Sequence, residues 1–163
     1  MHKYSDLLSL AQLSPDGFAR LLASAAVQRM ETSAALAGKN LALIFEKPSL
    51  RTRSTFEIAV RELGGDTLHL PPEFAEGTRE PLEDVARNLE RWVSALVIRT
   101  YAQEKATTLA VAAPKLHVIN ALSDEQHPCQ ALADVLTLRE HLDRKSTRLN
   151  SSHVSESRMP SSA

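Results

Sequence analysis

The stretch that decides the fold is NLALIF at residues 40–45, followed directly by EKPSLRTRSTFE at residues 46–57. Apart from its first residue the hexapeptide is apolar, as expected for a strand buried on both faces of a sheet. The polar residues after it lead into a helix whose apolar side chains include Phe56, Val60 and Leu63. We expect Gly64 and Gly65 to end that helix. A buried strand that leads into a helix is the repeating unit of parallel α/β sheets.

The same unit recurs along the chain. Further strands are predicted at residues 67–70, 95–98 and 116–120. Further helices are predicted from Pro15 to a stop at Gly38, over residues 80–92 with Trp92 on the apolar face, and through residues 109–112. A last helix is predicted to start at Pro128. Residues 71–79 have no periodicity and are predicted to form a loop. The fold class is therefore α/β: a four-stranded parallel sheet with helices on both faces, in three αβα layers.

Such a sheet predicts where a ligand binds. Ligands of open α/β sheets lie beyond the carboxyl ends of the strands. The candidate site therefore comprises the loops that follow Phe45, Leu70, Ile98 and Asn120.

Composition narrows the class of protein. The 163 residues include 19 Lys and Arg against 20 Asp and Glu, a balance that argues against a nucleic-acid or polybasic membrane binder. Hydrophobic residues make up 43%, enough for a buried core. The single cysteine, Cys129, excludes an intrachain disulfide and a cysteine-rich zinc site. No uncharged apolar run approaches the ~18 residues of a membrane span, and the first residues lack a signal-peptide core. We expect a cytoplasmic protein.

The last twenty residues differ from the rest. Residues 144–163 contain seven serines and only four apolar side chains. We therefore divide the chain into a domain at residues 1–143 and a disordered tail at residues 144–163. The tail is either a regulatory, phosphorylatable segment or sequence foreign to the fold. The second interpretation is favoured because a doubly wound chain should continue here into another strand.

The segment after the first strand is suited to binding an anion. It places Ser49, Arg51, Thr52 and Arg53 at the start of a helix, where backbone N–H groups and the helix dipole already favour negative charge. Arginine can add bidentate contacts to phosphate oxygens. The alternative is an N-capped helix with solvated arginines. The segment is not a glycine-rich nucleotide loop.

A second polar cluster follows the fourth strand. Pro128 fits a first helical position, which places His127 at the cap and Gln130 one turn further along the helix. Arg99 lies at the end of the third strand and should converge on the same edge. Imidazole, amide and guanidinium groups can all donate to a carbonyl oxygen. The alternative, a structural histidine, is less favoured because three strand ends deliver polar donors to one edge.

Both clusters match a known family. The segment Ser49-Leu50-Arg51-Thr52-Arg53 resembles the S-T-R-T-R phosphate motif of the aspartate and ornithine carbamoyltransferases. The segment His127-Pro128-Cys129-Gln130 resembles their HPxQ motif, in the HPCQ form common among the ornithine enzymes. The similarity extends over residues 4–143 and is specific to the carbamoyl-phosphate-binding domain at the amino terminus.

The resemblance implies a transferase that moves the carbamoyl group of carbamoyl phosphate to ornithine, giving citrulline and phosphate in arginine biosynthesis. It implies no cofactor, no metal, and a homotrimer in the complete protein. The implied substrate-binding residues are Ser49, Leu50, Arg51, Thr52, Arg99, His127 and Gln130; of these, Thr52, Arg99, His127 and Gln130 would be catalytic. For Arg53, ligand contact and a structural role both stay open.

The chain also departs from the family pattern. Leu50 replaces a threonine, which removes one hydroxyl from the phosphate site. Residues 71–80 contain no glutamine or lysine of the kind that reaches a neighbouring subunit, and Arg79 is the remaining candidate. The D-x-x-x-S-M-G and H-C-L-P motifs of the amino-acid-binding domain do not occur, so ornithine would bind through a domain missing from this sequence.

Alternative functions follow from these departures. The chain is either the donor-binding half of an enzyme, an inactive fragment that binds a phosphate ligand, or a module used only for association. A sibling enzyme acting on aspartate, putrescine or N-acetylornithine is a further alternative, because the residues that select the acceptor lie in the second domain.

Overall fold

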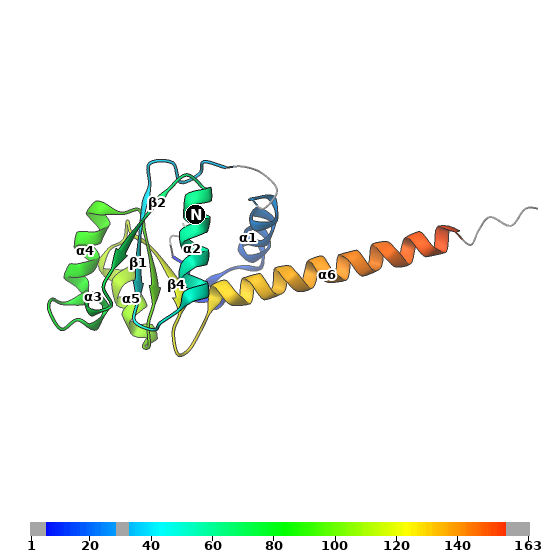
Figure 1. The fold of residues 1–163 in the computed structure, drawn as a ribbon. Coiled ribbons are helices and arrows are strands. Elements are labelled where there is room, and N and C mark those ends of the chain that lie inside the picture. Colours follow the sequence, from blue (N-terminus) through cyan, green and yellow to red (C-terminus); the bar gives the residue numbers. More distant parts are fainter. Residues whose placement is uncertain (1–5, 29–32, 156–163) are drawn as a thin grey trace, which may run out of the picture. The chain divides into compact units, whose positions relative to one another are not determined.

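The computed structural model describes residues 6–28 and 33–155. These residues form a parallel sheet of four strands in the order β2-β1-β3-β4 (Figure 1). The strands are β1 (Asn40–Phe45), β2 (Asp66–Leu70), β3 (Ala95–Arg99) and β4 (His117–Leu122). The predicted fold class is confirmed, and each predicted strand lies within two residues of its observed limits.

Two cores lie on opposite faces of this sheet. In β1, Ala42 and Ile44 belong to the larger core, whereas Leu41 and Leu43 belong to smaller clusters on the other face. The alternation follows from the period of two along a strand, and the burial of both faces explains why β1 after Asn40 and β3 before Arg99 are apolar.

Helices cover both faces (Figure 1). The larger core receives side chains from α3 (Glu73–Glu76), α4 (Leu82–Trp92) and α5 (Gln103–Ala112), and α2 (Leu50–Glu62) packs on the opposite face. Helix α3 corrects the prediction of a loop over residues 71–79; its four residues are too few for a periodic pattern. Trp92 is 64% exposed and does not belong to the core.

The helix predicted from Pro15 is α1, and it ends at Gln28 rather than at Gly38. Residues 29–32 lie outside the described residues. Gly38 instead lies in a separate turn with φ of 69°, a conformation that glycine adopts without strain. Gly64, with φ of 81°, follows α2 as predicted.

The amino-terminal segment extends the sheet beyond β4. Leu7 forms a parallel bridge to Ile119, with Leu7 N donating to Val118 O at 2.8 Å and Asn120 N donating to Leu7 O at 2.9 Å. This pairing satisfies backbone groups along the edge of β4 that would otherwise be exposed. The pairing is a single isolated bridge, too short to leave a strand pattern in the sequence.

The last helix, α6, runs from Pro128 to Ser155, and the chain divides after Gln130 into two compact units. In the structure residues 144–155 are helical and belong to α6, whereas sequence analysis expects a disordered tail from residue 144. Serine is a tolerable helix former, and neither proline nor glycine occurs between Cys129 and Met159. Residues 156–163 lie outside the described residues.

Candidate functional site

The loops that follow β1, β3 and β4 are joined by backbone hydrogen bonds. Glu46 N donates to Arg99 O at 2.8 Å, Thr100 N donates to Leu122 O at 2.9 Å, and Asp124 N donates to Tyr101 O at 2.8 Å. The predicted convergence of these three strand ends is therefore confirmed. The loop after β2 follows a strand that pairs in parallel with β1 and ends at the same edge.

The amino terminus of α2 begins at this edge with an unused cap. Ser49 occupies the N-cap position with an extended backbone, but its hydroxyl makes no capping hydrogen bond. The first-turn amides of α2 therefore receive no side-chain oxygen from the cap, which leaves them as donors toward the site. Thr52 is half-buried and Arg51 is exposed. The Leu50 side chain is 83% exposed. Because that side chain is apolar, the backbone amide is the only donor that Leu50 offers to an anion.

Arg99 ends β3 with an unsatisfied donor. Its Nε is buried and has no hydrogen-bond partner among the described residues. An unpaired buried donor costs about 1–3 kcal/mol, so such groups in folded proteins usually face a ligand or an ordered water. The guanidinium group of Arg99 can therefore donate to an oxygen atom of a bound ligand.

His127 precedes α6 at the cap, as predicted. Its Nδ1 accepts a hydrogen bond from Gln130 N at 3.4 Å. With Nδ1 as the acceptor, a neutral ring carries its proton on Nε2, a tautomer assigned here from the hydrogen bond. The half-buried His127 ring thus carries its N–H donor on Nε2, while Gln130 is exposed.

Cys129 lies in the same turn but is not a nucleophile. Its thiol donates to Asn120 O at 3.5 Å, and burial raises its pKa to about 11. At neutral pH almost none of it is the reactive thiolate. Its environment is that of a structural residue.

Arg53 is engaged in a structural contact. Its Nε donates to Glu57 Oε1 at 3.0 Å, and its Nη2 lies 3.0 Å from His69 Nδ1. His69 Nε2 in turn lies 3.2 Å from Glu57 Oε1. Arg53 thus joins α2 to β2, which favours the structural role that sequence analysis left open.

Sequence analysis missed Glu46, the first residue after β1. Its carboxylate accepts hydrogen bonds from Thr100 Oγ1 and from Tyr101 N, the latter at 3.2 Å, and it forms an ion pair with Lys105. The Glu46 side chain is only 6% exposed. A charged residue directly after a buried strand is the signal that could have identified it.

Sequence analysis also missed Lys47, the second charged residue after β1. It forms an ion pair with Asp124 in the loop after β4, and its Nζ lies 4.4 Å from the centre of the Tyr101 ring in the loop after β3. Glu46 and Lys47 together connect the end of β1 to the loops after β3 and β4. The site is therefore held by charged groups that do not belong to either recognised motif.

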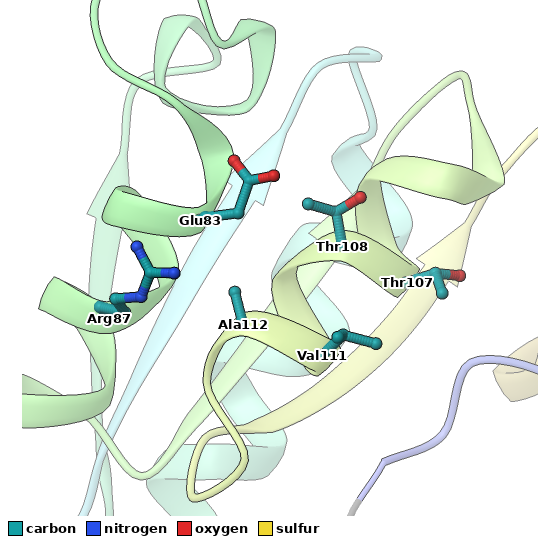
Figure 2. A pocket seen from close by; sticks show the side chains of 6 residues that line it. All are labelled: Glu83, Arg87, Thr107, Thr108, Val111 and Ala112. Atoms are coloured by element: carbon teal, nitrogen blue, oxygen red, sulfur yellow. The ribbon is translucent and has the colours of Figure 1, made fainter.

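A separate groove lies between α4 and α5 (Figure 2), with a volume of about 450 Å³. None of the predicted site residues lines it. The lining side chains come from those two helices and are Glu83, Arg87, Thr107, Thr108, Val111 and Ala112. Arg87 already pairs with Asp84 at 2.7 Å. The groove lies on helices that cover one face of the sheet, so we locate the functional site at the strand ends instead.

No described helix is long and apolar enough to cross a membrane. No group of three or more His, Cys, Asp or Glu side chains in the described part of the chain is arranged to hold a metal ion.

Comparison with known proteins identifies a family and shows how much of its relatives' length this chain covers. Residues 5–140 match the sequence model described as aspartate/ornithine carbamoyltransferase, carbamoyl-P binding domain. An ornithine carbamoyltransferase of Nostoc sp. PCC 7120 is 45% identical over 139 residues, which are 85% of this chain and 45% of that protein. The chain thus spans about half the length of the curated relatives it matches.

Solved structures agree with the fold. Ornithine carbamoyltransferase from Thermus thermophilus has 47% sequence identity and a TM-score of 0.77, and the match covers 83% of this chain and 48% of that one. A variant of N-acetyl-L-ornithine transcarbamylase, complexed with carbamyl phosphate and N-succinyl-L-norvaline, has 32% identity and a TM-score of 0.77, and the match covers 85% of this chain and 48% of that one.

Proposed function

This chain belongs to the aspartate/ornithine carbamoyltransferase family, and we propose that it binds carbamoyl phosphate as the donor-binding half of an ornithine carbamoyltransferase. The observation that carries the proposal is the pairing of two unsatisfied features at one sheet edge. These are the uncapped amino terminus of α2 at Ser49 and the buried, unpartnered Nε of Arg99. The amino terminus of α2 suits a phosphate, and the guanidinium group of Arg99 suits a carbonyl oxygen.

In this proposal the phosphate binds at the start of α2. Ser49 and Thr52 donate hydroxyl hydrogen bonds, Arg51 supplies the counter-charge, and the first-turn amides, including that of Leu50, donate to the remaining oxygens. Because Leu50 offers no hydroxyl, the backbone provides a larger share of the phosphate contacts here than a threonine would require.

The carbonyl group lies between Arg99, His127 and Gln130, with Thr52 close to the bridging oxygen. These donors stabilise the negative charge that develops on the carbonyl oxygen when an amine attacks the carbon. A C–N bond forms, the C–O bond to phosphate then breaks, and the amine releases a proton. Ornithine would thereby yield citrulline and phosphate, through positioning and electrostatic stabilisation.

Ornithine is the proposed acceptor because the ornithine carbamoyltransferases compared above are more similar in sequence than N-acetyl-L-ornithine transcarbamylase. The acceptor would bind to a second domain, whose motifs do not occur in this sequence. For the complete protein we propose a homotrimer that acts in arginine biosynthesis in the cytoplasm, on the basis of the family resemblance.

Calorimetry on the 163-residue chain tests donor binding. Phosphonoacetamide is the probe, because a CH₂ group replaces the labile bridging oxygen of carbamoyl phosphate; inorganic phosphate and acetamide are the controls. We expect saturable binding of phosphonoacetamide, weaker binding of phosphate and none of acetamide. Absence of phosphonoacetamide binding would contradict the proposal.

A citrulline assay on the same sample separates enzyme from fragment. With carbamoyl phosphate and ornithine, binding without citrulline formation supports a donor-binding half that needs the acceptor domain. Citrulline formation by this chain alone would show that ornithine binds without that domain. A chain that neither binds phosphonoacetamide nor changes its melting temperature with phosphate would be an association module.

A further inference from the structure

A buried network of three polar side chains supports the loop that ends at His127. Gln103 Oε1 accepts hydrogen bonds from Asn120 Nδ2 at 3.0 Å and from Ser123 Oγ at 2.6 Å. Gln103 Nε2 and Asn120 Nδ2 both donate to Leu8 O, at 3.2 Å and 3.1 Å. Asn120 is fully buried and Ser123 is 4% exposed. We call Gln103, Asn120 and Ser123 the polar brace.

The orientation of both amides in the polar brace is determined by fixed partners. A backbone carbonyl can only accept, so Leu8 O requires an N–H group from Gln103 and from Asn120. The Oε1 atom of Gln103 therefore faces Asn120 and Ser123. Asn120 Oδ1 accepts from Leu122 N at 3.0 Å, which agrees with the same orientation.

Asn120 stands at an irregularity beside Arg99. Ile98 is opposite Asn120, but Arg99 is opposite Leu122, so β4 contains one extra residue at this point. The Asn120 side chain supplies the acceptor that Leu122 N would otherwise lack. Bulges of this kind commonly re-aim side chains next to functional sites. Here the bulge accompanies the end of β3, where Arg99 is located.

Ser123 fixes the other end of the loop. Its Oγ accepts from Glu125 N at 3.2 Å and from Gln126 N at 3.1 Å, and Ser123 N donates to Gln126 O at 2.8 Å. With its one proton donated to Gln103, the hydroxyl uses its full hydrogen-bonding capacity. The turn over residues 123–126 is thus tied to α5, and His127 is the next residue.

We propose that Gln103 is a positioning residue for His127 and Arg99: it holds the turn that aims His127 and, through Asn120, the bulge beside Arg99. The inference rests on the proposed function. The hydrogen bonds of the Gln103 side chain go to Leu8, Asn120 and Ser123, and none goes to the phosphate-binding segment at residues 49–52. Its loss should therefore impair recognition of the carbonyl group and leave recognition of phosphate intact.

The polar brace also holds the amino-terminal segment, because Leu8 O accepts hydrogen bonds from Gln103 and Asn120. Buried networks of this kind fix geometry only when every member is satisfied. Removal of one member leaves the others unpaired in the core, and we expect the turn at residues 123–126 to shift.

The test compares two ligands on the full 163-residue chain. The Kd of inorganic phosphate divided by the Kd of phosphonoacetamide measures how much the amide carbonyl contributes to binding. Gln103→Met keeps the chain length of the side chain and removes its hydrogen bonds. We expect this ratio to fall about tenfold, with the Kd of phosphate within twofold of the parent. The control is Thr107→Val, which removes an exposed hydroxyl that donates to Gln103 O on the same helix.

A second pair of variants guards against unfolding of Gln103→Met. Ser123→Ala should lower the ratio, and Ser123→Thr, which retains the hydroxyl, should restore it. The ¹⁵N shifts of the His127 ring should change in Ser123→Ala and return in Ser123→Thr. A purely structural residue would lower the melting temperature without changing the ratio, and that result would overturn the inference. If the parent chain binds neither ligand, the proposed function fails instead.

Discussion

Glu46 and Lys105 form an ion pair that joins the residue after β1 to the first half of α5. The carboxylate also accepts from Thr100 and Tyr101, so one buried side chain connects two strand ends and a helix. The Lys105 side chain is 25% exposed, whereas that of Glu46 is 6% exposed. Because Glu46 is the more buried of the two, its charge depends more strongly on the ion pair than the charge of Lys105 does.

Removal of Lys105 should therefore destabilise the fold. Lys105→Met leaves a buried carboxylate with two hydrogen bonds and no counter-charge, a change worth about 3 kcal/mol in the free energy of unfolding. The double variant Glu46→Gln/Lys105→Met should recover part of this loss, because a neutral amide needs no counter-charge. Urea unfolding of the three proteins measures both effects, and equal stability of the single variant and the parent would show that the pair contributes nothing.

The two site arginines should differ in what they recognise. Arg51→Ala should weaken both phosphate and phosphonoacetamide, since its charge faces the phosphate in the proposed function. Arg99→Ala should weaken only phosphonoacetamide. In an enzyme that contains the acceptor domain, loss of such a donor should reduce kcat by about 10²–10³-fold.

The matched control for both arginines is Arg20→Ala, an exposed position on α1. It removes the same charge from the chain, so it separates a local contact from a change in net charge. Near-parental turnover in Arg99→Ala would contradict its role at the carbonyl group.

Arg53→Ala should leave ligand affinity unchanged. Its contacts are to Glu57 and His69, and all three side chains are at least 30% exposed. Exposed pairs contribute about 0–1 kcal/mol, so the melting temperature should fall only slightly. A loss of phosphonoacetamide binding comparable to that of Arg51→Ala would show that Arg53 contacts the ligand.

The thiol of Cys129 should resist alkylation in the folded protein. A pKa of about 11, against a reference of 9.0, reduces the thiolate fraction at pH 8 about a hundredfold. Iodoacetamide labelling followed by intact mass is unambiguous because the chain has one cysteine. Labelling should become fast in urea. Equal rates in folded and unfolded protein would contradict the assigned environment.

The same pKa has a consequence for stability. Because the folded pKa is raised, the thiol contributes fully below pH 9, where both states are protonated. Between about pH 9 and 11 only the unfolded chain releases the proton, so stability should fall over that range. Cys129→Ala should remove this part of the alkaline decline.

Removal of residues 144–163 should leave ligand binding unchanged. The family match ends at residue 140, and every residue of the proposed site lies before it. Calorimetry on a chain that ends at Asp143 should give the parental Kd for phosphonoacetamide. A weaker Kd would assign these residues to the functional domain.

Local patterns were sufficient for most of the architecture. The continuous apolar runs at residues 41–45 and 95–98 indicated strands buried on both faces, as is typical of a parallel sheet covered by helices. Residues 144–155, a serine-rich segment free of glycine and proline, lie within α6. Trp92 has the helical spacing of a core residue yet is 64% exposed, because α4 ends at that position.

The strands along the chain and the two motifs that identify the family could be predicted from local sequence, since both depend on residues close together along the chain. The side chains that hold the site became evident only from the fold. Glu46 meets Lys105, and Gln103 meets Asn120 and Ser123, across 59, 17 and 20 residues respectively. Such contacts leave no pattern in the local sequence, because the same charged or amide residue can lie in solvent or in a core. Only folding, which removes water from these groups, makes their partners obligatory.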